Sequence, residues 1–193
     1  MRFIDTTTFK FHELTDSEVR DLENGYSTLS HRWTWGSDEI KYHDILALDD
    51  KCVRFGEGAR LRSDLDETCC INKTDSVELG EAINSMYRWY AESAICIAYL
   101  EDVASVEYTE QSEWFMRGWT LQELIAPKRL QFYNSHWSLL GDKSSLSDVL
   151  VRKTGIPADV LKNQKDPRAC SVAQRMSWAA GRRQVVWRTA LTA

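Results

Sequence analysis

The order of apolar and polar residues predicts an alternation of strands and helices. Residues 26–30 (YSTLS) are β-prone and follow the turn-like segment 23–25 (ENG), so a first strand is expected there. A helix is expected from the N-cap candidate Asp75 through 77–94, where apolar residues recur at helical spacing. The helix leads into 95–100 (ICIAYL), an apolar run typical of a strand covered on both faces. The residues expected on the apolar face of the helix are Leu79, Ile83, Met86, Tyr87 and Tyr90.

The next part of the chain repeats this alternation. Residues 112–127 have the composition of a helix that a proline terminates, and 130–133 (LQFY) are expected to form a further strand. A weaker helix is expected over 143–154. The pattern predicts an α/β fold with a mostly parallel sheet and helices on both faces. Ligands bind near the carboxyl ends of the strands in such folds, which makes the loop 31–36 (HRWTWG) a candidate binding segment.

Composition excludes several classes of protein and agrees with the predicted fold. The chain has 193 residues, 43% of them apolar, which fits one soluble domain. Its net charge of −5 argues against a mainly electrostatic grip on nucleic acid or anionic lipid. No apolar run approaches the roughly 20 residues that a membrane-spanning helix needs. Five unevenly spaced cysteines without a CxxC pair, and a start without an apolar signal segment, predict a reducing, cytoplasmic location.

Three segments together resemble the fungal heterokaryon incompatibility (HET) domain. They are 26–33 (YSTLSHRW), 68–102 (TCCINKTDSVELGEAINSMYRWYAESAICIAYLED) and 114–127 (WFMRGWTLQELIAP), the last being the most specific. The resemblance covers most of residues 1–178. It implies an effector or signalling module of fungal non-self recognition and programmed cell death. Such a module is expected to act through protein partners or self-association and to require no cofactor.

The HET family is itself similar to Toll/interleukin-receptor (TIR) domains, which have a flavodoxin-like sheet and in some members hydrolyse NAD. The resemblance makes Glu123 the candidate catalytic carboxylate and NAD a candidate substrate. Cleavage of the nicotinamide ribosyl bond passes through an oxocarbenium-like state, which one carboxylate near the ribose could stabilise. The residues expected to help form the pocket are Ser30, Trp33, Arg117 and Trp119.

Each of these residues also has a purely structural interpretation. Glu123 could be a solvated residue on an exposed helical turn. Trp114 and Trp119 could stack on a nucleotide base, but aromatic side chains on a short helix more often fill a core. Arg117 could bind a phosphate, or pair with Glu113 four residues earlier. The pattern favours the structural interpretation of the tryptophans and of Arg117.

Other catalytic and metal-binding arrangements have little support. His31 could form a triad with Ser30 and either Asp66 or Asp102, but the chain has no GxSxG motif. Cys69 and Cys70 could act as a nucleophile or a ligand pair, although buried thiols are commonly small core residues. The four histidines are scattered, so no metal site is predicted.

Two segments depart from the family pattern. Residues 51–67 are glycine-interrupted and charged where the family brings an apolar strand, so a central strand is expected to be missing or replaced and the sheet incomplete. Residues 179–193 lose the family pattern and are expected to be a divergent tail, disordered or wrongly translated. An inactive, truncated gene product is therefore a further hypothesis for the chain.

Overall fold

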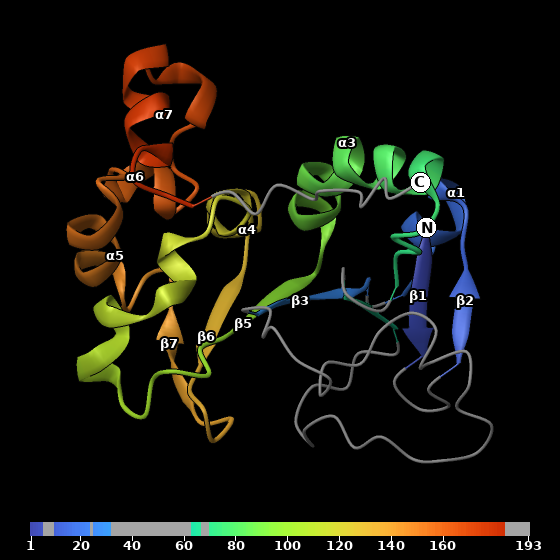
Figure 1. The fold of residues 1–193 in the computed structure, drawn as a ribbon, viewed down its shortest axis with the longest axis horizontal. Coiled ribbons are helices and arrows are strands. Elements are labelled where there is room, and N and C mark those ends of the chain that lie inside the picture. The colour runs from blue at the N-terminus through green and yellow to red at the C-terminus, as the bar shows by residue number, and fades with distance from the viewer. Residues whose placement is uncertain (6–9, 24, 32–62, 67–69, 184–193) are drawn as a thin grey trace, which may run out of the picture.

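The fold is organised around one mixed β-sheet. The structure is a computed structural model that describes residues 1–5, 10–23, 25–31, 63–66 and 70–183. The described residues form a seven-stranded sheet in the order β2-β1-β4-β3-β5-β6-β7 (Figure 1). The strands are β1 (Arg2–Asp5), β2 (Phe11–Glu13), β3 (Ser27–His31), β4 (Ser63–Asp66), β5 (Ile95–Tyr99), β6 (Leu130–Tyr133) and β7 (Leu139–Asp142).

The centre of the sheet is parallel, as the alternation of elements predicts. Strand β3 pairs in parallel with β4 on one side and with β5 on the other, and β5 pairs in parallel with β6. The remaining pairs, β1 with β2, β1 with β4 and β6 with β7, are antiparallel. The predicted α/β fold is confirmed, with the parallel part of the described sheet confined to the four strands β4, β3, β5 and β6. The predicted strands at 26–30, 95–100 and 130–133 correspond to β3, β5 and β6.

Strand β4 corrects the expectation of a missing central strand. Residues 63–66 lie between β1 and β3 and form backbone ladders with both, with Asp64 opposite Ile4 on one side and Ser27 on the other. Strand pairing requires the main-chain donors and acceptors, which a charged segment supplies as well as an apolar one. The rest of the atypical segment, 51–62 and residue 67, lies outside the described residues.

Short and long helices connect the strands. Helices α1, α3 and α4 stand in a row beside the sheet, while α5, α6 and α7 gather near β6 and β7 (Figure 1). The α-helices are α1 (Asp16–Arg20), α3 (Ser76–Glu92), α4 (Thr120–Ile125), α5 (Ser147–Thr154), α6 (Ala158–Leu161) and α7 (Val172–Ala179). Three 3-10 helices, η1 (Val106–Gln111), η2 (Glu113–Met116) and η3 (Pro167–Ala169), complete the connections.

Helix α3 starts where the sequence predicts and buries a partly different face. The Asp75 carboxylate accepts hydrogen bonds from the backbone N–H groups of Val77 and Glu78 at 2.9 and 3.2 Å, which caps the helix. Ile83 and Tyr87, expected on the apolar face, are 39% and 49% exposed. Met86 and Tyr90 are buried as expected, together with Ala82 and Trp89.

The predicted continuous helix over 112–127 is wrong. The segment forms η2, an extended residue at Arg117 and then the six-residue helix α4, which ends before Pro127. Ser112 begins η2 by accepting a hydrogen bond from the N–H of Trp114 at 3.2 Å. The split matters for the site, because it directs Trp114 and Glu123 toward the same strand.

The core lies between the sheet and the helices around it. Phe3 and Tyr26 make an edge-to-face contact with 5.1 Å between ring centroids, and the Tyr26 hydroxyl donates to the carbonyl of Trp89. Phe132 and Leu124 are 0% exposed. No helix in the described part of the chain is long and apolar enough to cross a membrane.

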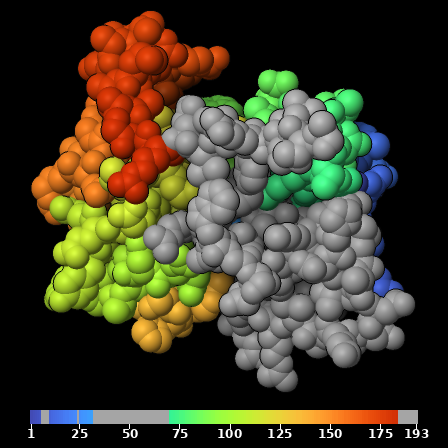
Figure 2. All heavy atoms as spheres, viewed as in Figure 1, coloured from blue at the N-terminus to red at the C-terminus, as the bar shows by residue number. Residues whose placement is uncertain are grey.

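The C-terminal region is more ordered than its weak pattern suggests. Helix α5 ends at Gly155, whose φ of 69° is the left-handed conformation that glycine adopts readily. Helix α7 protrudes from the neighbouring surface in the space-filling view (Figure 2). The predicted tail begins inside this helix, at Ala179, and residues 184–193 lie outside the described part of the chain.

Candidate functional site

A buried polar cluster joins the central strand β3 to helix α4. The Ser30 hydroxyl donates a hydrogen bond to Oε2 of Glu123 and accepts one from the indole Nε1–H of Trp114 at 2.8 Å. Ser30 and Glu123 are each 2% exposed, and Trp114 is 1% exposed. The predicted site residues Ser30 and Glu123 are therefore brought into direct contact. Glu123 is buried, so the interpretation that it is a solvated residue on an exposed helical turn is wrong.

Trp114 packs in the core, as the structural interpretation of this residue predicted. Its ring lies edge-to-face on Phe115 and on Phe132, with centroid separations of 5.1 and 5.8 Å. Its backbone carbonyl accepts a hydrogen bond from the Thr120 hydroxyl at 2.7 Å. Since the indole N–H also has Ser30 as acceptor, Trp114 locks η2, α4 and β3 together.

Arg117 reaches the end of β3 through the main chain. Its Nη1 donates to the carbonyl oxygen of His31 at 2.5 Å. The expected pairing with Glu113 does not occur. Glu113 lies instead 3.8 Å from Arg183, because the extended backbone at Arg117 breaks the helical spacing on which that pairing depended.

The segment 181–183 is attached to this region. The N–H of Gly118 donates to the carbonyl of Arg183 at 2.9 Å, and the N–H of Arg183 donates to the carbonyl of Met116 at 2.6 Å. Arg182 donates from Nη1 to the carbonyl of Arg117 at 3.1 Å and to the Thr120 hydroxyl at 3.0 Å. Burial lowers the pKa of Arg182 to about 10, and the nearby negative charge of Glu123 opposes that shift.

The two remaining predicted site residues do not join the cluster in the described structure. Trp33 lies outside the described residues. Trp119 is the N-cap residue of α4 and lines a cavity beside that helix. Leu121, Gln122 and Ile125 of α4 also line the cavity, whereas Thr120, Glu123 and Leu124 turn into the core on the other side of the helix, as the 3.6-residue period requires.

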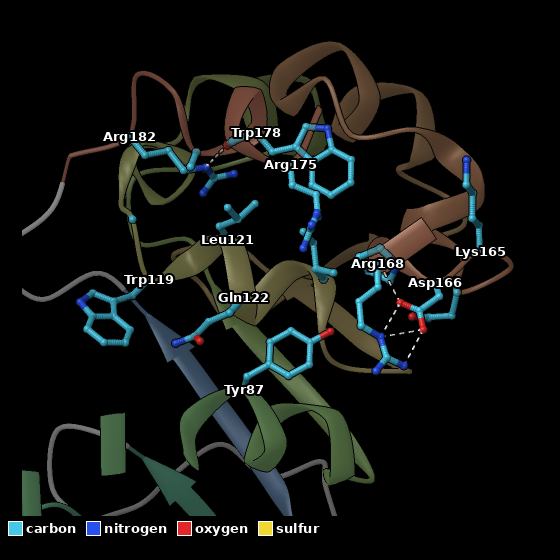
Figure 3. A pocket seen from close by; sticks show the side chains of 15 residues that line it. Tyr87, Trp119, Leu121, Gln122, Lys165, Asp166, Arg168, Arg175, Trp178 and Arg182 are labelled. Carbon is cyan, nitrogen blue, oxygen red and sulfur yellow. Dashed lines mark hydrogen bonds and ion pairs between the residues drawn. The ribbon is translucent and has the colours of Figure 1, made fainter. Parts of the chain in front are cut away.

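The cavity was not predicted from the sequence. It has a volume of about 1050 Å³ and lies between α3, α4 and the segment 163–182 (Figure 3). Four basic side chains and one acidic side chain line it, in a chain whose net charge is −5. The sequence holds one signal for it, because Arg168, Arg175 and Arg182 recur every seven residues.

A buried lysine closes the carboxyl end of α4. Lys143 is 4% exposed, and its Nζ donates to the carbonyl oxygens of Pro127 at 2.6 Å and Ile125 at 3.4 Å. These carbonyls lie at the end of a helix, where they lack intrahelical partners. Burial lowers the pKa of Lys143 to about 8, and burial likewise raises the pKa of the nearby Cys96 thiol.

The alternative catalytic arrangements gain no support. Asp102 accepts hydrogen bonds from the Ser112 hydroxyl at 2.7 Å and the N–H of Glu113 at 2.8 Å, so its carboxylate caps η2. Cys70 is buried, in line with a core role, whereas Cys69 lies outside the described residues. Within the described ranges, no group of three His, Cys, Asp or Glu side chains is arranged to hold a metal ion.

The fold and the site thus define the class of protein, which is an α/β domain with a buried polar cluster and an open basic cavity. The chain is related in sequence to the vegetative incompatibility protein HET-E-1 of Podospora anserina, with 36% identity over 186 residues. The match includes 83% of this chain and 14% of HET-E-1, so the chain corresponds to a small part of that protein's length.

The other comparisons return no match. No family profile matches the chain, and no solved structure is significantly similar to it. The relationship with HET-E-1 supports the predicted link to heterokaryon incompatibility in fungi. The expected similarity to TIR domains stays a prediction.

Proposed function

We propose that this chain is an effector or signalling module of vegetative incompatibility, which acts through protein partners or self-association. The observation that carries the proposal is the 36% identity to HET-E-1 over 83% of the chain. The name of that relative assigns it to vegetative incompatibility, and cell death is the outcome that the sequence resemblance implies.

The character of the polar cluster supports a module that acts by association. Ser30, Glu123 and Trp114 satisfy one another inside the core, which is how buried polar groups fix one packing arrangement. Apolar side chains are meanwhile exposed on helices of the surface. Val172 and Met176 on α7 are each 66% exposed, so this protruding helix offers apolar surface to a partner.

Controlled expression in a filamentous fungus tests this proposal. We expect induction of the full chain in Podospora anserina to stop growth and reduce the viability of hyphae, scored with a vital dye. The variant Trp114→Ala, which removes the centre of the core, is expected to abolish the effect. Trp137→Ala, which removes a 42% exposed tryptophan, is expected to retain it. Accumulation of folded chain without loss of viability would contradict the proposal.

The alternative function, hydrolysis of NAD with Glu123 as the catalytic carboxylate, stays a prediction. Glu123 is 2% exposed and does not line the cavity among the described residues, so no observation favours this function over association. The purified chain and its Glu123→Gln variant can be compared for NAD consumption, with circular dichroism on both. Depletion of NAD by the folded wild type alone would replace the association proposal with the enzymatic one.

A further inference from the structure

The cavity between α3, α4 and the C-terminal segment has an excess of positive charge. Of its basic residues, Arg168 pairs with Asp166 at 2.7 Å and is thereby neutralised. Arg182 donates only to neutral oxygens, the carbonyls of Trp178 and Arg117 and the Thr120 hydroxyl. Its charge has no acidic side chain in direct contact among the described residues. The cavity therefore attracts an anion.

Arg175 adds a cation that is free to bind a ligand. It extends from α7 toward α4 and Tyr87 in the close view (Figure 3). It is exposed and forms no ion pair with any described residue, unlike Arg168 beside it. A guanidinium group binds phosphate or carboxylate oxygens with two parallel hydrogen bonds.

Gln122 supplies a second unpartnered donor. Its side chain lies between Trp119 and Tyr87 in Figure 3, and it lines the cavity. The amide nitrogen is buried and has no hydrogen-bond partner among the described residues. Because a buried donor without an acceptor costs stability, its retention beside a cavity indicates an acceptor that arrives with a ligand.

Three aromatic side chains contribute to the walls of the cavity. Trp119 lies at one end, and Tyr87 and Trp178 lie nearer its centre (Figure 3). Tyr87 is 49% exposed, although it lies on a helix whose other aromatic residues are buried. Exposed aromatic rings offer flat apolar surface to a flat ring of a ligand.

We propose that this cavity binds a phosphorylated small molecule that carries a flat aromatic ring, the chemistry of a nucleotide. Phosphate oxygens would lie against Arg175 and Arg182, and the ring against Tyr87 or Trp119. The volume of about 1050 Å³ is at the upper end of small-molecule sites and is ample for one nucleotide. The aromatic side chains beside the basic ones favour such a ligand over an acidic peptide, which would use only the charges.

Calorimetric titration of the full chain tests the proposal with ATP as probe. Adenosine and inorganic pyrophosphate, titrated separately, supply the ring alone and the anion alone. We expect ATP to bind at least about tenfold more tightly than either half, because both parts of the cavity are then used. Affinity for ATP is expected to fall as salt is added, since the contact with Arg175 is ionic.

Three variants locate the binding. Arg175→Gln is expected to weaken ATP binding about tenfold or more, the effect of losing a charge-assisted hydrogen bond. Gln122→Met is expected to weaken it about fivefold without lowering the melting temperature of the free chain, so lost binding is separable from lost folding. Arg152→Gln removes the same charge from α5, where Arg152 pairs with Glu110 outside the cavity, and should leave affinity unchanged.

Several results would overturn the proposal. One is the absence of ATP binding by chain that circular dichroism shows to be folded. A second is equal binding by wild type and Arg175→Gln. Equal affinity for pyrophosphate and ATP would show that the aromatic residues of the cavity do not bind the ring. Tighter binding of a glutamate-rich peptide, displacing ATP, would assign the cavity to a protein partner instead.

Discussion

The two sides of helix α4 differ in whether their polar groups have hydrogen-bond partners. On the buried side, Glu123 and Thr120 have hydrogen-bond partners in the core, and the hydroxyl of Ser30 both donates and accepts. On the cavity side, the amide nitrogen of Gln122 has no acceptor among the described residues, and Arg175, which lines the same cavity, forms no ion pair with any of them.

This difference separates residues that hold the fold from residues available to a ligand. Satisfied buried polar groups specify one packing arrangement and are costly to disturb. Unpartnered donors contribute nothing to the fold, or destabilise it, until an acceptor binds. Substitutions on the two sides of α4 should therefore change the free energy of unfolding in opposite directions.

The largest effect is expected on the buried side, from Trp114→Ala. The substitution removes the ring contacts with Phe115 and Phe132 and leaves the Ser30 hydroxyl without its indole donor. We expect the free energy of unfolding to fall by about 3–5 kcal/mol, as measured by urea denaturation. Trp137→Ala, which removes an exposed ring stacked on Tyr99, should cost about 1 kcal/mol. Similar costs for the two variants would contradict the central role of Trp114.

A matched pair of serines on β3 tests the polar cluster itself. Ser30→Ala leaves both Glu123 and the Trp114 indole without the hydroxyl, and we expect a loss of about 2–3 kcal/mol. Ser27 is also buried on β3, but its hydroxyl has no partner among the described residues. Ser27→Ala should therefore be neutral or slightly stabilising. Equal losses would show that strand packing, and not the hydrogen bonds, decides the effect.

The end of α4 should respond to pH through Lys143. Its pKa is about 8 in the folded chain, against an ordinary value of 10.5. Between pH 7 and 9 the folded chain releases the Lys143 proton while the unfolded chain keeps it, so stability rises with pH in this window. Relative to Lys143→Met, the wild type should gain about 1 kcal/mol of unfolding free energy from pH 7 to pH 9. The subtraction removes the titration of all groups that the two proteins share. A difference that is constant with pH would mean that Lys143 does not titrate there.

The smallest effect is expected on the cavity side, from Gln122→Met. The substitution keeps the length of the side chain and removes an unsatisfied donor, so the free chain should gain up to about 1 kcal/mol. Thermal unfolding by calorimetry would detect this as a rise in melting temperature. A clear loss of stability would show that the Gln122 amide already has a partner in solution.

Much of the fold could be predicted from sequence because its central elements are local. Helix α3 has an N-cap at Asp75 and a clear period, and β5 and β6 are continuous apolar runs. Helices α1 and α7 were missed although each begins with a readable capping box, at Thr15 and Ser171. The short strands β1, β2 and β7 carry too few residues for a period, and their pairing partners decide their structure.

The candidate site shows the same limit. Ser30 and Glu123 were both predicted, but their direct contact depends on the break at Arg117, where the backbone is extended. A helical pattern in the sequence does not reveal that break. The break accompanies the packing of Trp114 on Phe132 of β6, a contact between residues far apart in the sequence. The cavity was missed for a related reason, because its lining residues come from α3, α4 and the C-terminal segment.

The two outer strands of the described sheet restrict how copies of this chain can meet. Strand β2 has three residues and β7 has four, and the pairing of β6 with β7 shifts register between Phe132 and Tyr133. Short, irregular edges are poor templates for another β-strand, so edge-to-edge growth into fibrils is disfavoured. An assembly of this domain would therefore be held by side chains on helices and not by a shared backbone ladder.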